Sequence, residues 1–117
     1  MAYLEKMRIG CDIVHITRFV QKINKNSGLV AKIFSEHELQ HNPSIESLAG
    51  MFAAKEAALK ALQLAAGSWL DLVYSKLPSG EPTLLYIPNN NITIMVSISH
   101  DGEYASAFVL CELVLTV

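Results

Sequence analysis

The chain has 117 residues, of which 51% are apolar and 17% charged, and its formal net charge is −2. This size and composition are typical of one globular core, so we expect residues 1–117 to form a single domain. No apolar run approaches the roughly 20 residues that cross a bilayer, and the first ten residues lack the apolar core of a signal peptide, so membrane insertion and export are not expected.

The first expected element is an apolar, β-branched run from Met7 to Ile16, which is typical of a buried strand. Asp12 interrupts it, and a carboxylate in a core must be paired, hydrogen-bonded or bound to a cation. Capping of the next helix or pairing with an arginine would satisfy Asp12 as well as a cation would. Cys11 and Cys111 have no metal-binding spacing, and we expect them to be buried, reduced thiols of a cytoplasmic protein.

A helix is expected over Thr17–Lys25, and its basic residues recur at i, i+4 and i+7, so they would form one stripe: Arg18, Lys22 and Lys25. Residues 13–35 contain four bases and no acid, whereas acids outnumber bases by eleven to five in the rest of the chain. The stripe is either a solvated helix face or a docking site for an acidic protein. Nucleic acid is disfavoured because the net charge is negative and no aromatic residues lie among the bases.

The strongest helix signal spans Ile45–Leu64, where large apolar residues recur at 3.6-residue spacing among many alanines. Before it, Ser35 and Glu38 form a capping-box pattern that predicts a short helix ending before Pro43. Within the long helix Glu56 and Lys60 lie one turn apart. They are either a surface ion pair contributing about 0.3–0.5 kcal/mol or part of a site for a cation and a phosphate. The second interpretation is favoured by three small residues on this part of the helix, which would leave space for a ligand: Ala49, Ala53 and Ala57.

After Gly67 the pattern becomes strand-like, and four strands are expected: Trp69–Leu77, Pro82–Ile87, Ile92–Ser99 and Tyr104–Val114. Helices early and strands late predict an α+β fold with an antiparallel sheet packed on the long central helix. His100 follows the third of these strands at a turn, where it is either a hydrogen-bonded turn residue or part of a site. His37 and His41 have the spacing of a zinc pair but no third ligand nearby.

Together these segments resemble the holo-acyl-carrier-protein synthase family of short 4′-phosphopantetheinyl transferases. The matching segments, in order, are Gly10-Cys11-Asp12-Ile13, Phe52-Ala53-Ala54-Lys55-Glu56-Ala57 with Lys60 and Ala61, and Ser97-Ile98-Ser99-His100. Each is weak alone, but their combination and order are specific. The resemblance implies an enzyme that moves the phosphopantetheine arm of coenzyme A onto a serine of an acyl or peptidyl carrier protein and releases 3′,5′-adenosine bisphosphate.

The resemblance also implies roles for individual residues. Asp12 and Glu56 would hold Mg²⁺ and, with Lys60, carry out catalysis, while Lys60 and His100 would face the coenzyme A phosphates. Arg18, with Lys22 and Lys25, would receive the carrier protein. Members of the family are usually homotrimers, with coenzyme A in clefts between neighbouring subunits.

Two positions depart from the family pattern. The Gly-Thr-Gly loop that usually follows the central helix is missing, and in this stretch Gly67 and Ser68 are the residues expected to contact coenzyme A. Met51 stands where an arginine is common. Both changes concern the nucleotide end of coenzyme A and leave the expected metal site intact.

Three alternatives remain open at this point. One is a hot-dog-like acyl-CoA thioesterase, which would need no Mg²⁺. Another is a small ligand-binding or assembly domain in which Asp12 and the Glu56–Lys60 pair are only structural. The third is a catalytically weak coenzyme A-binding relative. The chain has no GxSxG, Walker-type or GxGxxG motif, which disfavours common serine hydrolases, P-loop enzymes and dinucleotide binders.

Overall fold

The computed structural model describes residues 3–116 of the chain, with side chains described over residues 6–114. The elements in chain order are β1 (Tyr3–His15), α1 (Ile16–Lys25), α2 (Leu29–Ile33), α3 (Glu36–Leu39), α4 (Ile45–Leu62), the 3₁₀ turn η1 (Trp69–Asp71), β2 (Leu72–Lys76), β3 (Pro82–Tyr86), β4 (Ile92–Asp101) and β5 (Tyr104–Thr116). The strands form one sheet in the order β1-β5-β4-β3-β2, and every neighbouring pair is antiparallel. The expected α+β fold is confirmed.

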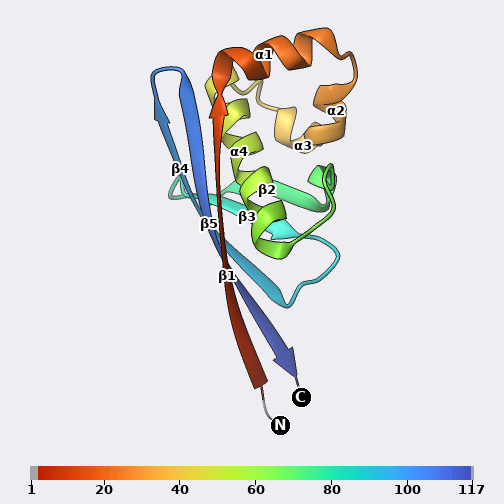
Figure 1. Cartoon of the computed structure of the whole chain (residues 1–117), viewed down its shortest axis with the longest axis vertical. Coiled ribbons are helices and arrows are strands. Elements are labelled where there is room, and N and C mark those ends of the chain that lie inside the picture. The colour runs from red at the N-terminus through yellow and green to blue at the C-terminus, as the bar shows by residue number, and fades with distance from the viewer. Residues whose placement is uncertain (1–2, 117) are drawn as a thin grey trace.

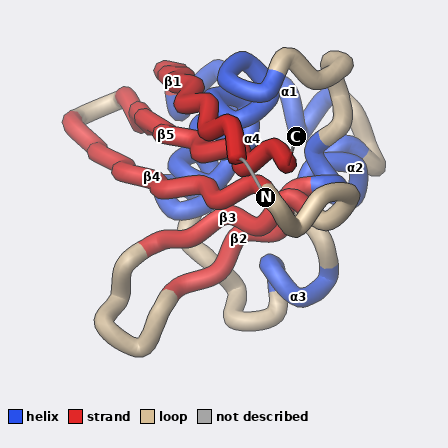
Figure 2. Tube along the Cα trace, turned by 90° about the horizontal axis from the view of Figure 1, so that it is seen from below, coloured by secondary structure: helices blue, strands red, loops and turns tan. Residues whose placement is uncertain are grey.

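The helices lie on one side of this sheet. Figure 1 shows β1 and β5 running side by side along the long axis of the molecule, with α4 against them and α1 to α3 around the upper part of α4. Figure 2, seen from below, shows the five strands as one curved layer with the helices gathered on one side. No helix over residues 3–116 is long and apolar enough to cross a membrane. The core lies between α4 and the sheet and extends to Phe19 of α1, Ile33 of α2 and Leu72 of β2.

Small residues bring α4 and β1 into close contact. An added Cβ at Gly10 would lie 2.1 Å from the backbone oxygen of Ala57, so only glycine fits there. Ala49, Ala53 and Ala57 are fully buried in this interface. The expectation that these alanines leave room for a ligand is therefore wrong, because they fill the space between helix and sheet.

The opposite face of the sheet, over the described strands, leaves several large apolar side chains exposed beside serines. Its large exposed residues include Met7, Ile9, Ile13, Met95 and Phe108, each of them 47–66% exposed. The expectation that the first strand is buried is therefore correct for one face only. Since successive side chains alternate between faces, Asp12 points toward α4 while its neighbours point away.

Cys11 lies on this open face and is exposed, which corrects the expectation that both thiols are buried. Cys111 alternates to the α4 side and is buried as expected. Burial raises the pKa of the Cys111 thiol to about 11. The two cysteines therefore differ in accessibility, although both lie in apolar strands.

Two segments differ from the sequence-based expectation. Leu29–Ile33 forms α2, a single helical turn too short to produce a periodic pattern. Trp69–Asp71 forms η1, so the strand expected from Trp69 begins only at Leu72. The other expected helices and strands are confirmed, with ends shifted by a few residues.

A buried ion pair connects α4 with the segment before it. Lys55 Nζ donates to Glu38 Oε1 at 2.8 Å and to the backbone oxygen of Ile33 at 2.7 Å, and neither charged side chain is exposed. Glu38 also accepts from the backbone nitrogens of Ser35 at 2.8 Å, within the expected capping box, and of Tyr74 at 2.7 Å. Burial lowers the pKa of Lys55, and the hydrogen bond and charge of Glu38 oppose that shift. One carboxylate thus joins α3, α4 and β2.

Candidate active site

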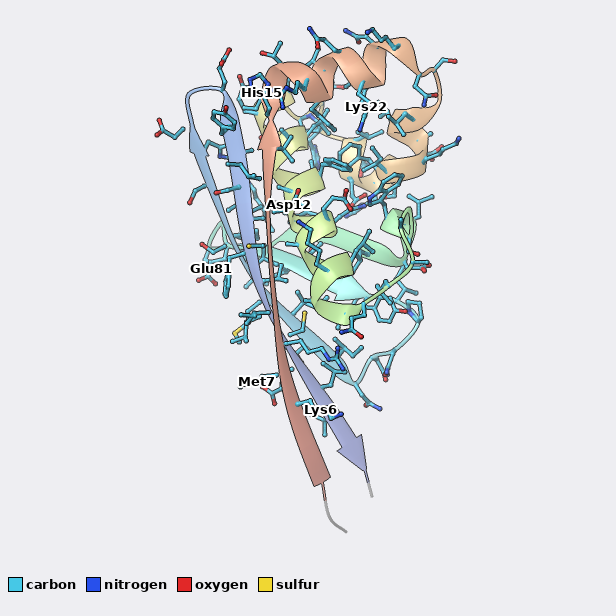
Figure 3. All side chains as sticks on the ribbon, in the orientation of Figure 1. Lys6, Met7, Asp12, His15, Lys22 and Glu81 are labelled. Atoms are coloured by element: carbon cyan, nitrogen blue, oxygen red, sulfur yellow. The ribbon has the colours of Figure 1, made fainter. Side chains whose placement is uncertain are left out.

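The centre of the candidate site is a contact between β1 and α4. Lys60 Nζ donates to Asp12 Oδ1 at 2.8 Å and to the backbone oxygen of Cys11 at 3.1 Å. The Asp12 side chain is 17% exposed and that of Lys60 is 59% exposed, so the pair lies at the mouth of the helix–strand interface. Figure 3 shows Asp12 on β1 beside α4. Asp12 therefore pairs with Lys60, rather than capping a helix or binding an arginine.

Glu56 lies one turn before Lys60 on α4 but does not form the expected surface ion pair with it. Its Oε2 atom instead accepts from the indole nitrogen of Trp69 at 3.4 Å. The hydrogen bond to Asp12 raises the pKa of Lys60, and the charges of Asp12 and Glu56 add to the shift, while partial burial opposes it. Both carboxylates therefore act on the same ammonium group.

The donor set of this site fits a hard divalent cation. Two carboxylates from different elements are the oxygen ligands that Mg²⁺ prefers, and Mg²⁺ commonly keeps several waters and binds phosphate oxygens. Over the described part of the chain, no group of three or more His, Cys, Asp or Glu side chains is arranged to hold a metal. A cation at Asp12 and Glu56 would thus take its remaining ligands from water and substrate.

The structure does not bring His100 next to Lys60. His100 Nε2 lies 2.9 Å from the backbone oxygen of Glu46, in the first turn of α4. Since a carbonyl oxygen can only accept, Nε2 donates this bond and Nδ1 is the nitrogen left for another partner. Glu46 and Lys60 are fourteen residues apart, which corresponds to about 21 Å along a helix axis. His100 therefore contacts the first turn of α4, whereas Lys60 belongs to its last turn and extends its ammonium group to Asp12 of β1.

Separate cavities accompany these two groups. His100 lines a cavity of about 810 Å³ between the start of α4 and the strands β2 to β4, which also includes His37, His41, Met51 and Tyr74. Asp12 and Lys60 line another, of about 420 Å³, that reaches the open face of the sheet near Phe108. Gly67 and Ser68 line a third, of about 500 Å³, with Lys32 and Trp69. Trp69 thus connects the wall of this third cavity to Glu56.

The basic stripe of α1 is fully presented to solvent. Arg18, Lys22 and Lys25 are all exposed, and the first turn of α1 contains no acidic residue. His15 caps the helix by accepting from the backbone nitrogen of Arg18 at 3.2 Å. Figure 3 shows Lys22 on α1, above the Asp12 region and on the same side of the sheet. A basic surface of this kind is suited to an acidic partner.

Sequence reasoning missed Trp69 and the Lys55–Glu38 pair. The apolar pattern predicts a strand from Trp69 onward, and nothing in its spacing indicates a contact with Glu56. Lys55 did carry a signal, because it falls between Phe52 and Leu59 in the apolar stripe of α4. A lysine at such a position must have a buried acceptor.

Comparison with known proteins connects this geometry to a family. The model of the 4′-phosphopantetheinyl transferase superfamily matches residues 8–109, which include both candidate carboxylates, Lys60 and His100. The chain belongs to this superfamily. The hot-dog-like thioesterase and the unrelated binding domain are therefore ruled out as families for it.

Relatives within the superfamily share most of the chain. The holo-[acyl-carrier-protein] synthase of Campylobacter curvus is 41% identical over 108 residues, covering 85% of this chain and 95% of that protein. The synthase of Halalkalibacterium halodurans is 38% identical over 112 residues, covering 88% and 92%. The Helicobacter pylori synthase, solved in complex with coenzyme A, superposes with a TM-score of 0.77 at 35% identity, covering 86% of this chain and 96% of that chain. The first two relatives are similar to this chain in sequence over most of its length, and the third is similar in both sequence and fold.

Proposed function

We infer that this chain is a holo-[acyl-carrier-protein] synthase, which transfers the 4′-phosphopantetheine arm of coenzyme A to a serine of an apo carrier protein. The observation that carries the inference is the Asp12–Lys60 hydrogen bond of 2.8 Å between β1 and α4, with Glu56 one helical turn before Lys60, in a chain of this superfamily. The names of the relatives and the coenzyme A complex of one of them support the same activity.

We propose that Asp12 and Glu56 hold Mg²⁺. When bound, the ion would neutralise the negative charge of the coenzyme A diphosphate and so favour its cleavage. Asp12 is suited to this role because its side chain is only partly exposed and its carboxylate lies at a cavity that Lys60 also lines. Glu56 is suited because only one of its oxygens accepts a hydrogen bond from within the described side chains.

In the proposed reaction, the carrier serine oxygen attacks the β-phosphorus of coenzyme A, and the bond to 3′,5′-adenosine bisphosphate breaks. Lys60 places a fixed positive charge beside the diphosphate, where negative charge grows in the transition state. Its raised pKa keeps this charge throughout the neutral pH range. The serine proton passes to Glu56 or to a water molecule.

Coenzyme A carries its 3′-phosphate one ribose away from its diphosphate. Within one copy, His100 and Lys60 line separate cavities. We therefore propose that coenzyme A lies between copies, with Asp12, Glu56 and Lys60 from one subunit and His100 from the next. The assembly would be a homotrimer, with Gly67 and Ser68 contributing from the loop beside Trp69.

The open apolar face of the sheet supports this assembly. Exposed side chains from β1, β4 and β5 form a patch that isolated soluble domains rarely leave uncovered: Met7, Ile9, Ile13, Met95 and Phe108. A second copy of the chain would bury it, because identical subunits commonly associate through such surfaces. The cavity at Asp12 and Lys60 extends to this face, which would bring the site to the subunit boundary.

We propose that the carrier protein docks on α1 through Arg18, Lys22 and Lys25. Acyl and peptidyl carriers both present acidic helices, so the stripe fits either class. A cytoplasmic location stays a prediction.

Intact-mass spectrometry of an apo carrier protein tests the reaction. Incubation with this chain, coenzyme A and Mg²⁺ should add one phosphopantetheine group, about 340 Da, to the carrier. EDTA should abolish the gain, and excess Mg²⁺ should restore it. No gain with either an acyl or a peptidyl carrier would contradict the proposed function and leave a catalytically weak coenzyme A-binding relative.

A further inference from the structure

Trp69 makes a contact with Glu56 that the proposed chemistry does not yet explain. Its indole Nε1 lies 3.4 Å from Glu56 Oε2 and donates to it across the gap between η1 and α4. Trp69 is the only tryptophan of the chain. Both residues are half-buried, so the hydrogen bond lies where water has limited access.

Aromatic packing holds the indole in place independently of this bond. The Trp69 ring tilts at 55° on Phe52, with ring centroids 5.9 Å apart. Phe52 precedes Glu56 by one helical turn, so both face the same side of α4. Phe52 in turn stacks on Phe19 of α1 at 5.2 Å and 25°. The position of the indole nitrogen is therefore set by three elements, α1, α4 and η1.

The geometry assigns Trp69 as a positioning residue for Glu56. The Trp69 N–H donates a hydrogen bond to Glu56 Oε2 and so fixes the rotation of the carboxylate. Glu56 Oε1 is then left to face the divalent cation. This inference rests on the proposed function, because it presumes a cation at Glu56. Groups that hydrogen-bond a metal ligand orient it, and their loss typically weakens metal binding by about 10–100-fold. The 3.4 Å separation is long for such a bond, as is common in unliganded sites, and we expect it to shorten on cation binding.

The test is Trp69→Phe, which keeps an aromatic ring for packing on Phe52 and removes the N–H donor together with the smaller ring of the indole. Calorimetric titration of Mg²⁺ into protein saturated with coenzyme A should give a dissociation constant about 10–100-fold higher than that of the wild type. The Mg²⁺ concentration for half-maximal transfer should rise in parallel, and the KM for the carrier protein should not. Ile94→Val is the matched control, because it deletes one buried methyl group on β4, away from η1.

A second readout needs no turnover. In the wild type, Mg²⁺ added to the coenzyme A complex should change the fluorescence of Trp69, and Glu56→Gln should abolish the change. Mg²⁺ affinity of Trp69→Phe within threefold of the wild type would overturn the positioning role, as would an equal loss in Ile94→Val. If the wild type itself neither binds Mg²⁺ nor transfers the arm, the proposed function fails instead.

Discussion

At the scale of single residues, the two lysines of α4, Lys55 and Lys60, have different roles. Lys55 is fully buried and tied to Glu38, whereas Lys60 is largely exposed and paired with Asp12. The first pair fixes the helix to α3 and β2 and has no access to a substrate. The second pair lies at the mouth of a cavity, where its charge is available.

Replacing Lys55 with Met should therefore lower the free energy of unfolding strongly, by about 3–5 kcal/mol, because the Glu38 charge loses its buried partner. The double variant Lys55→Met/Glu38→Gln should recover part of this loss, since Gln still offers an acceptor without a net charge. Urea unfolding followed by circular dichroism measures both. Equal stability of the single variant and the wild type would show that the pair is not important for the fold.

At the scale of elements, the α4–β1 contact was only partly predictable. The alternation of β1 and the periodicity of α4 indicate which faces are apolar, and the capping box marks the start of α3. The distance between helix and strand depends instead on Gly10 meeting the backbone of Ala57, which no local pattern encodes. The contact of Trp69 with Glu56 likewise depends on where η1 packs. The sequence thus indicated the carboxylates but not their hydrogen-bond partners.

Gly10→Ala tests that contact. Its Cβ would meet the backbone oxygen of Ala57, so β1 and α4 must separate, and we expect a loss of stability of at least about 1–3 kcal/mol and a matching loss of transfer activity. At Gly50 an added Cβ would meet side-chain atoms of His100 and Ile98 at 2.9–3.0 Å, and these can shift. Gly50→Ala should therefore be milder in thermal unfolding. The reverse order would contradict the packing described.

The basic stripe of α1 is a second element that can be tested alone. Arg18→Glu should raise the KM for the carrier protein while the affinity for coenzyme A stays unchanged. The effect should shrink as salt is added, because exposed charges are screened over about 8–10 Å. Steady-state kinetics at low and high salt provide the measurement. An unchanged KM at low salt would mean that the stripe is only a solvated helix face.

At the scale of the whole molecule, one copy of the chain separates groups that one substrate must contact. Asp12 and Lys60 line one cavity and His100 lines another, and one face of the sheet leaves large apolar side chains exposed. The family resemblance implies all three residues, but only the structure shows that Asp12 and Lys60 line one cavity and His100 another. We therefore propose that the coenzyme A site is shared by two copies of the chain.

Subunit mixing tests this arrangement. Asp12→Ala and His100→Ala homotrimers should each have low activity. After the two are unfolded and refolded together in equal amounts, about a quarter of the interfaces should combine an intact Asp12 with an intact His100, and activity should rise to that fraction of the wild type. Activity no higher than the mean of the separate variants would mean that each copy acts alone.

The most direct test of the account is Mg²⁺-dependent transfer in variants of the two carboxylates. Asp12→Ala and Glu56→Gln should fold with the secondary structure of the wild type, yet leave the mass of an apo carrier protein unchanged under conditions in which the wild type converts it completely. Normal conversion by either folded variant would contradict the claim that these two side chains hold the cation on which the transfer depends.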